Sequence, residues 1–231
     1  MENNRDRKGI FLGVISVATL IVAIIGATFA YFSASFTGNE EVNFTAYEFS
    51  ASATVNRIAP SSDVDDLIPV DAANVFTLAS NTRNNNKGAC KDANDYTACL
   101  IYEVTIYNSG SQDLSLTGEL KTTTASAFTH LKLVPATVNS GTYTADGDVM
   151  SIGGAQDATT GIFTSSSANK TFTVQANDDS TFYFIIYLEN AIDSQTSEET
   201  SQNEEMGATY VGQLVFSSGT GGQLKATITT G

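Results

Sequence analysis

Few residues of this chain have the chemistry of a catalytic centre. Among its 231 residues there is one histidine, His130, and no tryptophan. No serine or cysteine around His130 suggests a nucleophile paired with a base, and no H-E-x-x-H, G-x-S-x-G or phosphate-binding loop motif occurs. Composition alone does not exclude a carboxylate pair for glycoside hydrolysis, but no aromatic-rich cleft accompanies the acids. We therefore predict no enzyme activity, no catalytic residue and no cofactor, and we interpret His130 as a surface or edge residue.

The two cysteines, Cys90 and Cys99, enclose the eight residues KDANDYTA. A metal site would need further ligands that the sequence does not offer, and a thiol–disulfide exchange motif would need C-x-x-C spacing. In an exported chain, a close and isolated pair is typical of a structural disulfide. The sequence therefore predicts a Cys90–Cys99 disulfide that closes a small loop.

Acidic residues dominate the charge of the chain, which is −14 at neutral pH. This charge disfavours nucleic acid, because phosphate binding requires clustered Lys and Arg. Oxygen donors that would suit calcium occur in three groups, but none follows a calcium-loop pattern. We interpret them as solvated loops and predict no metal site. The groups are Asp63/Asp65/Asp66, Asp92/Asn94/Asp95 and Asp178/Asp179.

The N-terminal stretch Ile10–Phe36 determines where the rest of the chain lies. Three basic residues precede it, and small residues follow its apolar run, as in an export signal. Counted to Phe32, however, the apolar run has 23 residues, long enough to span a bilayer core of about 30 Å. Residues 1–30 are therefore either a cleaved signal peptide or an uncleaved anchor, with membrane contact only through residues 10–32. In both cases residues 31–231 lie outside the cytoplasmic membrane.

Residues 31–231 predict an all-β domain, an antiparallel β-sandwich, because apolar and polar residues alternate and turn clusters recur every 8–12 residues. The clearest strand is Leu100–Asn108, which a short Asn/Gly turn joins to Asp113–Lys121 in a hairpin or a sandwich crossover. The alternation slips by one residue after Ala46, which predicts a bulge or a change of sheet. Further strands are expected at 31–36, 130–134, 149–152, 161–164, 171–175, 210–216 and 223–229, the last two as a closing hairpin.

Three regions do not alternate. Within residues 56–98, the stretch 60–71 has four aspartates and two prolines and predicts an exposed acidic loop. Val75–Leu78 predicts a short strand, and 81–91 predicts a polar, turn-rich loop that leads into the cysteine pair. Residues 190–207 are acidic and polar, which indicates a loop with one helical turn near 198–206. Thr181–Glu189 is apolar at nearly every position, which predicts a central strand buried on both sides or a strand whose outer face meets another molecule.

The segment Ala27–Ala34, ATFAYFSA, resembles the end of the signal peptide in the TasA and camelysin family of secreted proteins. Tyr102–Leu116 resembles the family's core of two strands around an Asn-x-Gly turn. Tyr210–Gln213 is similar to its late Tyr-x-Gly strand. The Cys90/Cys99 pair and the long region 56–98 depart from the family pattern.

The resemblance implies processing by a SipW-type signal peptidase, with Thr28 at −3, cleavage after Ala30 and Tyr31 at the mature N-terminus. It also implies a jelly-roll-like sandwich, secreted to the cell surface or the extracellular matrix. There the chain would bind copies of itself in biofilm-matrix fibres. The assembly strand would be Tyr31–Phe36, with Phe32, Ala34 and Phe36 filling pockets of the neighbouring subunit. Pairing of this strand within its own domain is one alternative. Another is a membrane-anchored surface β-sandwich that serves adhesion or ligand binding.

Overall fold

The structure is a computed structural model that describes most of the chain after residue 32. The described residues are 33–37, 41–46, 49–60, 67–80, 89–157, 159–161, 171–190, 205, 208–219 and 221–230. The signal or anchor at residues 1–30 therefore lies outside the described residues. Among the described helices, none has the length and apolar character to cross a bilayer.

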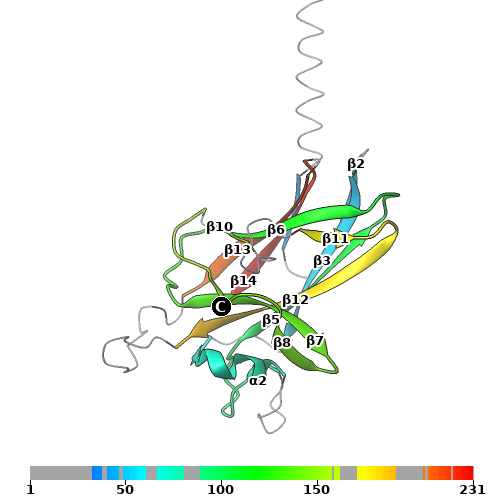
Figure 1. The fold of residues 1–231 in the computed structure, drawn as a ribbon. Helices are drawn as coiled ribbons and strands as arrows, with labels where there is room; N and C mark the ends of the chain where they lie inside the picture. The colour runs from blue at the N-terminus through cyan, green and yellow to red at the C-terminus, as the bar shows by residue number, and fades with distance from the viewer. Residues whose placement is uncertain are drawn as a thin grey trace, which may run out of the picture.

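Two β-sheets form the body of the molecule (Figure 1). Sheet A has the order β1 (Ser33–Thr37), β14 (Gln223–Thr230), β13 (Tyr210–Ser218), β6 (Leu114–Thr122) and β10 (Thr159–Gly161), and β11 (Phe172–Val174) also pairs with β6. Sheet B has the order β2 (Glu41–Ala46), β3 (Phe49–Ala59), β5 (Leu100–Asn108), β12 (Asp178–Glu189), β7 (Leu131–Asn139) and β8 (Thr142–Ala145). Two short strands extend sheet B, β4 (Pro69–Val70) beside β12 and β9 (Met150–Ser151) beside β7. The predicted all-β sandwich is confirmed.

The main core lies between the sheets and contains the residues that the alternation placed on one face. Leu100, Tyr102, Val104 and Ile106 of β5 are all buried in it. Sheet A supplies Leu116 and Leu120 of β6, together with alternate residues of β13 and β14. Alternation with period 2 follows from this arrangement, because each strand turns every second side chain towards the other sheet.

The outer face of sheet B is covered by residues 67–80 and 89–99, which we call the cap. A second buried cluster joins Val75, Ala79 and the cysteines of the cap to Ile185 and Tyr187 of β12. Of the two alternatives for this strand, a central strand buried on both sides is therefore confirmed for Phe184–Leu188 of β12. Its outer face meets a segment of its own chain.

The predicted strand at Val75–Leu78 is wrong. The cap contains a 3-10 turn, η1 (Ala72–Asn74), followed by a short helix, α2 (Val75–Ala79). The carboxylate of Asp71 accepts a hydrogen bond from the N–H of Ala73 at 3.1 Å, which caps the start of this helical segment. Val75 and Ala79 are the buried residues of α2. They are four residues apart, which is the spacing of one face of a helix and not the two-residue alternation of a strand.

The one-residue slip after Ala46 marks the end of one strand and the start of the next. β2 and β3 pair as antiparallel neighbours in sheet B, with Ala46 opposite Phe49. The interpretation as a bulge or a change of sheet is therefore wrong. In contrast, β5 and β6 belong to different sheets, so the Asn/Gly turn between them makes the crossover that was one of the two alternatives.

The remaining strands largely follow the sequence pattern, and β13 and β14 form the predicted closing hairpin. β7 is longer than expected, and a tight turn joins it to β8, a strand that the sequence pattern did not reveal. Ser140 and Gly141 both have positive φ angles in this turn, as two-residue hairpin loops require. Of the expected strand 161–164 only Gly161 is described, as the last residue of β10, and residues 162–164 lie outside the described residues. Most of the expected loop 190–207 also lies outside them.

Candidate assembly interface

The N-terminal strand β1 lies at an edge of sheet A. It pairs in parallel with β14, from Ser33 opposite Gln223 to Thr37 opposite Thr227. In the described part of the chain, β14 is the only strand that pairs with β1. We call β1 and β14 together the assembly edge. Pairing within the same domain, one of the alternatives from the sequence, is therefore the arrangement in this single chain.

β14, the strand to which β1 pairs, is held in place by its neighbour in the sheet and by the core. It pairs along its whole length with β13, which pairs in turn with β6. Leu224, Ala226 and Ile228 of β14 are buried in the main core. The register places Ala34 and Phe36 of the expected assembly strand opposite Leu224 and Ala226. β14 therefore keeps its core contacts whichever strand occupies its outer edge.

Gly212 in β13 shows how closely this sheet is packed. A Cβ atom built on it would lie 2.6 Å from the Tyr210 hydroxyl oxygen and 2.8 Å from a methyl carbon of Leu120. Only a glycine leaves room for the Tyr210 ring, which covers it and is completely buried. This contact explains the Tyr-x-Gly spacing in structural terms.

The expected assembly strand lies only partly within the described residues. Thr28, Ala30, Tyr31 and Phe32 lie outside the described residues. Ala34 and Phe36 lie within β1, and their main-chain pairing is described.

The predicted disulfide is confirmed. Cys90 and Cys99 are bonded to each other, and neither exposes any surface. The loop between them folds on itself, with Lys91 and Thr97 paired as a β-bridge and the Ala98 N–H donating to the Cys90 carbonyl at 2.8 Å. A buried disulfide indicates an oxidising, extracellular environment for this domain.

His130 takes part in a hydrogen-bonded cluster that the sequence did not reveal. Its Nδ1 lies 2.5 Å from Oε1 of Glu205, and the Thr129 hydroxyl donates to the same oxygen at 2.6 Å. The Glu205 side chain is only 5% exposed, whereas that of His130 is 39% exposed. Burial alone would raise the pKa of Glu205, but hydrogen bonds from Thr129 and His130 outweigh it and hold the pKa below its ordinary value of 4.5.

This cluster is a structural clamp and not a nucleophile with its base. The Thr129 hydroxyl and the Glu205 carboxylate both lie within hydrogen-bond distance of the same ring nitrogen, Nδ1 of His130. In a catalytic triad the hydroxyl and the carboxylate contact different nitrogens of the imidazole, which lies between them. Glu205 belongs to residues 190–207, for which the sequence predicted an acidic, polar loop with one helical turn. Its 75-residue separation from His130 left no local signal.

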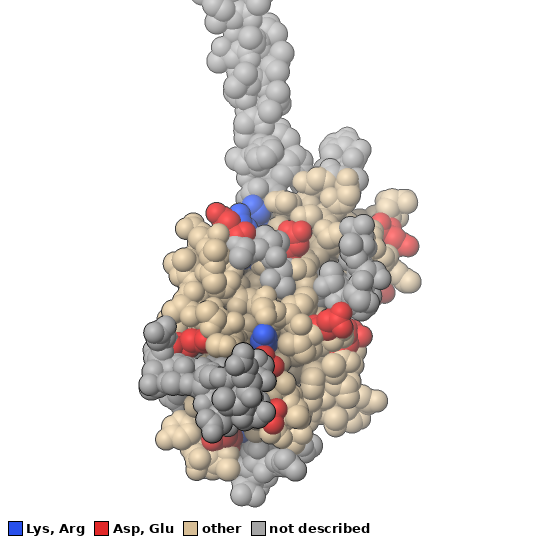
Figure 2. All heavy atoms as spheres, turned by 60° about the vertical axis from the view of Figure 1, so that its left-hand side comes forward, with Lys and Arg blue, Asp and Glu red and all other residues tan. Residues whose placement is uncertain are grey.

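Two of the acidic groups that were compared with calcium ligands accept hydrogen bonds from main-chain N–H groups close by in the sequence. Oδ1 of Asp92 accepts hydrogen bonds from the N–H groups of Asn94 and Tyr96, at 2.9 and 2.8 Å. Oδ1 of Asp178 accepts from the N–H of Asp179. Asp63, Asp65 and Asp66 lie outside the described residues, and within the described ones no three His, Cys, Asp or Glu side chains gather as metal ligands. Figure 2 shows acidic side chains scattered over one face, with few basic ones.

Comparison with known proteins gives no family for this chain. No family model and no curated protein matches it. A FixG-related protein from Vibrio parahaemolyticus is similar over 78% of this chain and 94% of its own, with 8% identity and a TM-score of 0.33. The PapD-like domain 7 of human CEP192 is similar over 77% and 80%, with 7% identity and a TM-score of 0.25. Neither likeness assigns a function, and none supports the resemblance to the TasA and camelysin family, which stays a hypothesis.

Proposed function

We propose that this protein is an exported structural subunit of extracellular fibres, in the biofilm matrix or on the cell surface, and not an enzyme. In this proposal residues 1–30 are removed by a SipW-type signal peptidase, and residues 31–231 form a jelly-roll-like sandwich. The segment Tyr31–Phe36 then leaves its own domain and adds to sheet A of a neighbouring copy.

The observation that carries the proposal is the position of β1. It is a short N-terminal strand at a sheet edge, and its five register pairs all involve β14. Exchange of such a strand between copies replaces each main-chain hydrogen bond by the same bond to a neighbour, so it costs little free energy. When each copy gives its strand to one neighbour and receives a strand from another, the exchange is head-to-tail. It builds an open filament when the rotation between copies does not close a ring.

The buried disulfide also supports the proposal, because it suits a protein that works outside the cell. The alternative, a membrane-anchored surface β-sandwich for adhesion or ligand binding, differs in the fate of residues 10–32. Mass spectrometry of protein extracted from the cell surface separates the two. A mature N-terminus at Tyr31 supports the fibre subunit, whereas an intact N-terminus supports the anchored protein.

Deletion of Tyr31–Phe36 tests the assembly step. We expect the truncated domain to keep its far-UV circular dichroism and thermal transition but to remain monomeric by light scattering and electron microscopy. Filaments of the truncated domain would refute assembly through this strand.

Two proline variants, Ala34→Pro and Ser35→Pro, provide a matched control. Successive N–H groups of a strand point to opposite sides, so only one of these two prolines removes a donor that faces β14. We expect one variant to lose assembly and the other to retain most of it. Equal behaviour of the pair would contradict an edge-to-edge ladder.

A further inference from the structure

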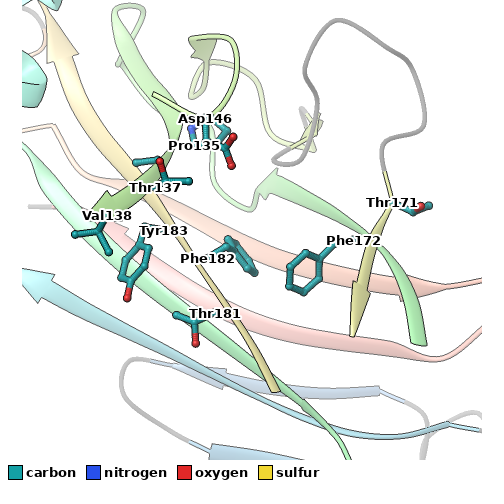
Figure 3. A pocket seen from close by; sticks show the side chains of 10 residues that line it. Pro135, Thr137, Val138, Asp146, Thr171, Phe172, Thr181, Phe182 and Tyr183 are labelled. Atoms are coloured by element: carbon teal, nitrogen blue, oxygen red, sulfur yellow. The ribbon is translucent and has the colours of Figure 1, made fainter. Parts of the chain in front are cut away.

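A pocket of about 420 Å³ opens where β7 and β12 diverge in sheet B (Figure 3). The ladder between these strands ends with Tyr183 opposite Ala136. The Glu189 N–H donates to the His130 carbonyl at 3.0 Å, so residues 189 and 130 form a hydrogen-bonded pair. In an antiparallel ladder every second pair of opposite residues is hydrogen-bonded, which gives Tyr183 with Ala136 as one of these pairs. The next such pair would be Thr181 with Val138, and both residues line the pocket instead.

The floor of the pocket is aromatic. Phe172 of β11 and Phe182 of β12 lie edge to face, with ring centroids 5.4 Å apart. Phe182 also packs edge to face against Phe216, 5.9 Å away, which holds its ring in place. Two sheets therefore meet here and present half-buried aromatic rings to the pocket.

The rim of the pocket carries a single charge. Of the ten lining residues, Asp146 alone is charged, and no Lys, Arg or His is among them. The Asp146 N–H donates to the Pro135 carbonyl at 2.9 Å, which fixes the main chain at this rim. Figure 3 shows the Asp146 carboxylate on one side of the opening and the two phenylalanine rings across from it. Thr137, Val138 and Thr181 are among the other residues that line the pocket, and none of them is charged.

We propose that this pocket binds a small organic cation, a primary ammonium attached to an aromatic or branched apolar body. The carboxylate accepts a charge-assisted hydrogen bond from the ammonium group. The apolar body replaces water above Phe172 and Phe182. The volume lies within the range of small-molecule pockets, and the net charge of −14 concentrates cations around the protein and repels anions. The site is independent of the assembly edge.

Three probes with the same phenyl body and different charge test the proposal on the wild-type protein: 2-phenylethylammonium, 2-phenylethanol and phenylacetate. In NMR titrations at low salt, we expect the ammonium to perturb the amides of residues 136–138, 146 and 181–183 with the lowest dissociation constant. The alcohol should bind about five- to tenfold more weakly, as the loss of one charge-assisted hydrogen bond implies, and phenylacetate should not bind. Equal binding of ammonium and alcohol, or no perturbation of these amides, would overturn the proposal.

Two matched variants locate the charge that selects the ligand. Asp146→Asn should weaken ammonium binding about five- to tenfold and leave binding of the alcohol unchanged. Asp148→Asn removes a charge two residues further along the same loop, outside the pocket lining, and should have little effect. An equal loss of ammonium affinity in both variants would show that the net negative charge of the protein attracts the ligand. That result would refute a defined site at Asp146. Circular dichroism confirms that each variant is folded.

Discussion

Removal of the Cys90–Cys99 disulfide should destabilise the protein by a predictable amount. The bond closes a loop of ten residues, since the cysteines are nine positions apart. In the chain-entropy model, such a loop stabilises the folded state by about 2.7 kcal/mol at 25 °C. With a urea m-value of about 2 kcal/mol/M, the double variant Cys90→Ala/Cys99→Ala should unfold at a midpoint about 1.3 M lower.

Loss of the disulfide should also destabilise the cap locally. The Cys90 N–H donates to the Leu78 carbonyl at 2.9 Å, and the Ala98 N–H donates to the Cys90 carbonyl. In the double variant, hydrogen exchange at both amides should accelerate more than exchange in β5, because the cap opens before the sheets do. A Cys90→Ser/Cys99→Ser variant is the control that separates loss of the link from polarity at the buried site.

A small change in the urea midpoint of the double variant would refute the reasoning about the disulfide. A midpoint within about 0.3 M of the wild-type value would mean that the loop keeps its structure in the denatured state or contributes nothing to the folded one.

Three further predictions follow from buried groups. Glu205→Gln should cost about 1.5 kcal/mol at pH 7, since it weakens charge-assisted hydrogen bonds, whereas the exposed Glu119→Gln should have no effect. Because the pKa of Glu205 is lowered on folding, its contribution is present above pH 4.5 and is lost as the pH falls below it, so urea unfolding of the Gln variant should show a smaller decline in acid. Gly212→Ala should destabilise by about 1–3 kcal/mol through overlap with Tyr210, while Gly219→Ala, with open space around its Cβ position, should be neutral in thermal unfolding. Burial raises the pKa of Tyr102 and of Tyr187 from 10.0 to about 12, so their contribution to stability should be full below pH 10 and decrease between pH 10 and 12. The part of the tyrosinate absorbance at 295 nm that Tyr102→Phe and Tyr187→Phe remove should appear together with unfolding.

Sequence reasoning succeeded where one face of a strand is buried and the other is not. Leu100–Asn108 alternates because every second residue enters the core between the sheets. The long apolar run of Thr181–Glu189 gave two alternatives, and burial on both sides, by the opposite sheet and by the cap, is the one that the structure shows for Phe184–Leu188. The close cysteine pair predicted the disulfide because no other partner for either cysteine exists in the chain.

The failures have physical causes. α2 has only five residues, too few to distinguish a helical period from a strand pattern. β8 is largely exposed, so no buried face imposes an alternation on it. The pairing of His130 with Glu205, and the pocket where β7 and β12 diverge, depend on contacts between distant segments. The residue pattern along β7 or β12 does not indicate where the pairing between the two strands ends.

Strand exchange along the assembly edge is the central claim, and one cross-linking measurement tests it most directly. Ser35 lies opposite Lys225 in the β1–β14 register. Two mature proteins, one with Ser35→Cys and one with Lys225→Cys, are mixed in equal amounts, assembled and oxidised, and the linked peptides are identified by mass spectrometry. Exchange predicts a 35–225 disulfide between different copies in the filaments, and none in the monomeric mixture. Filaments that form without this link, while a single chain with both substitutions still closes it internally, would contradict the account.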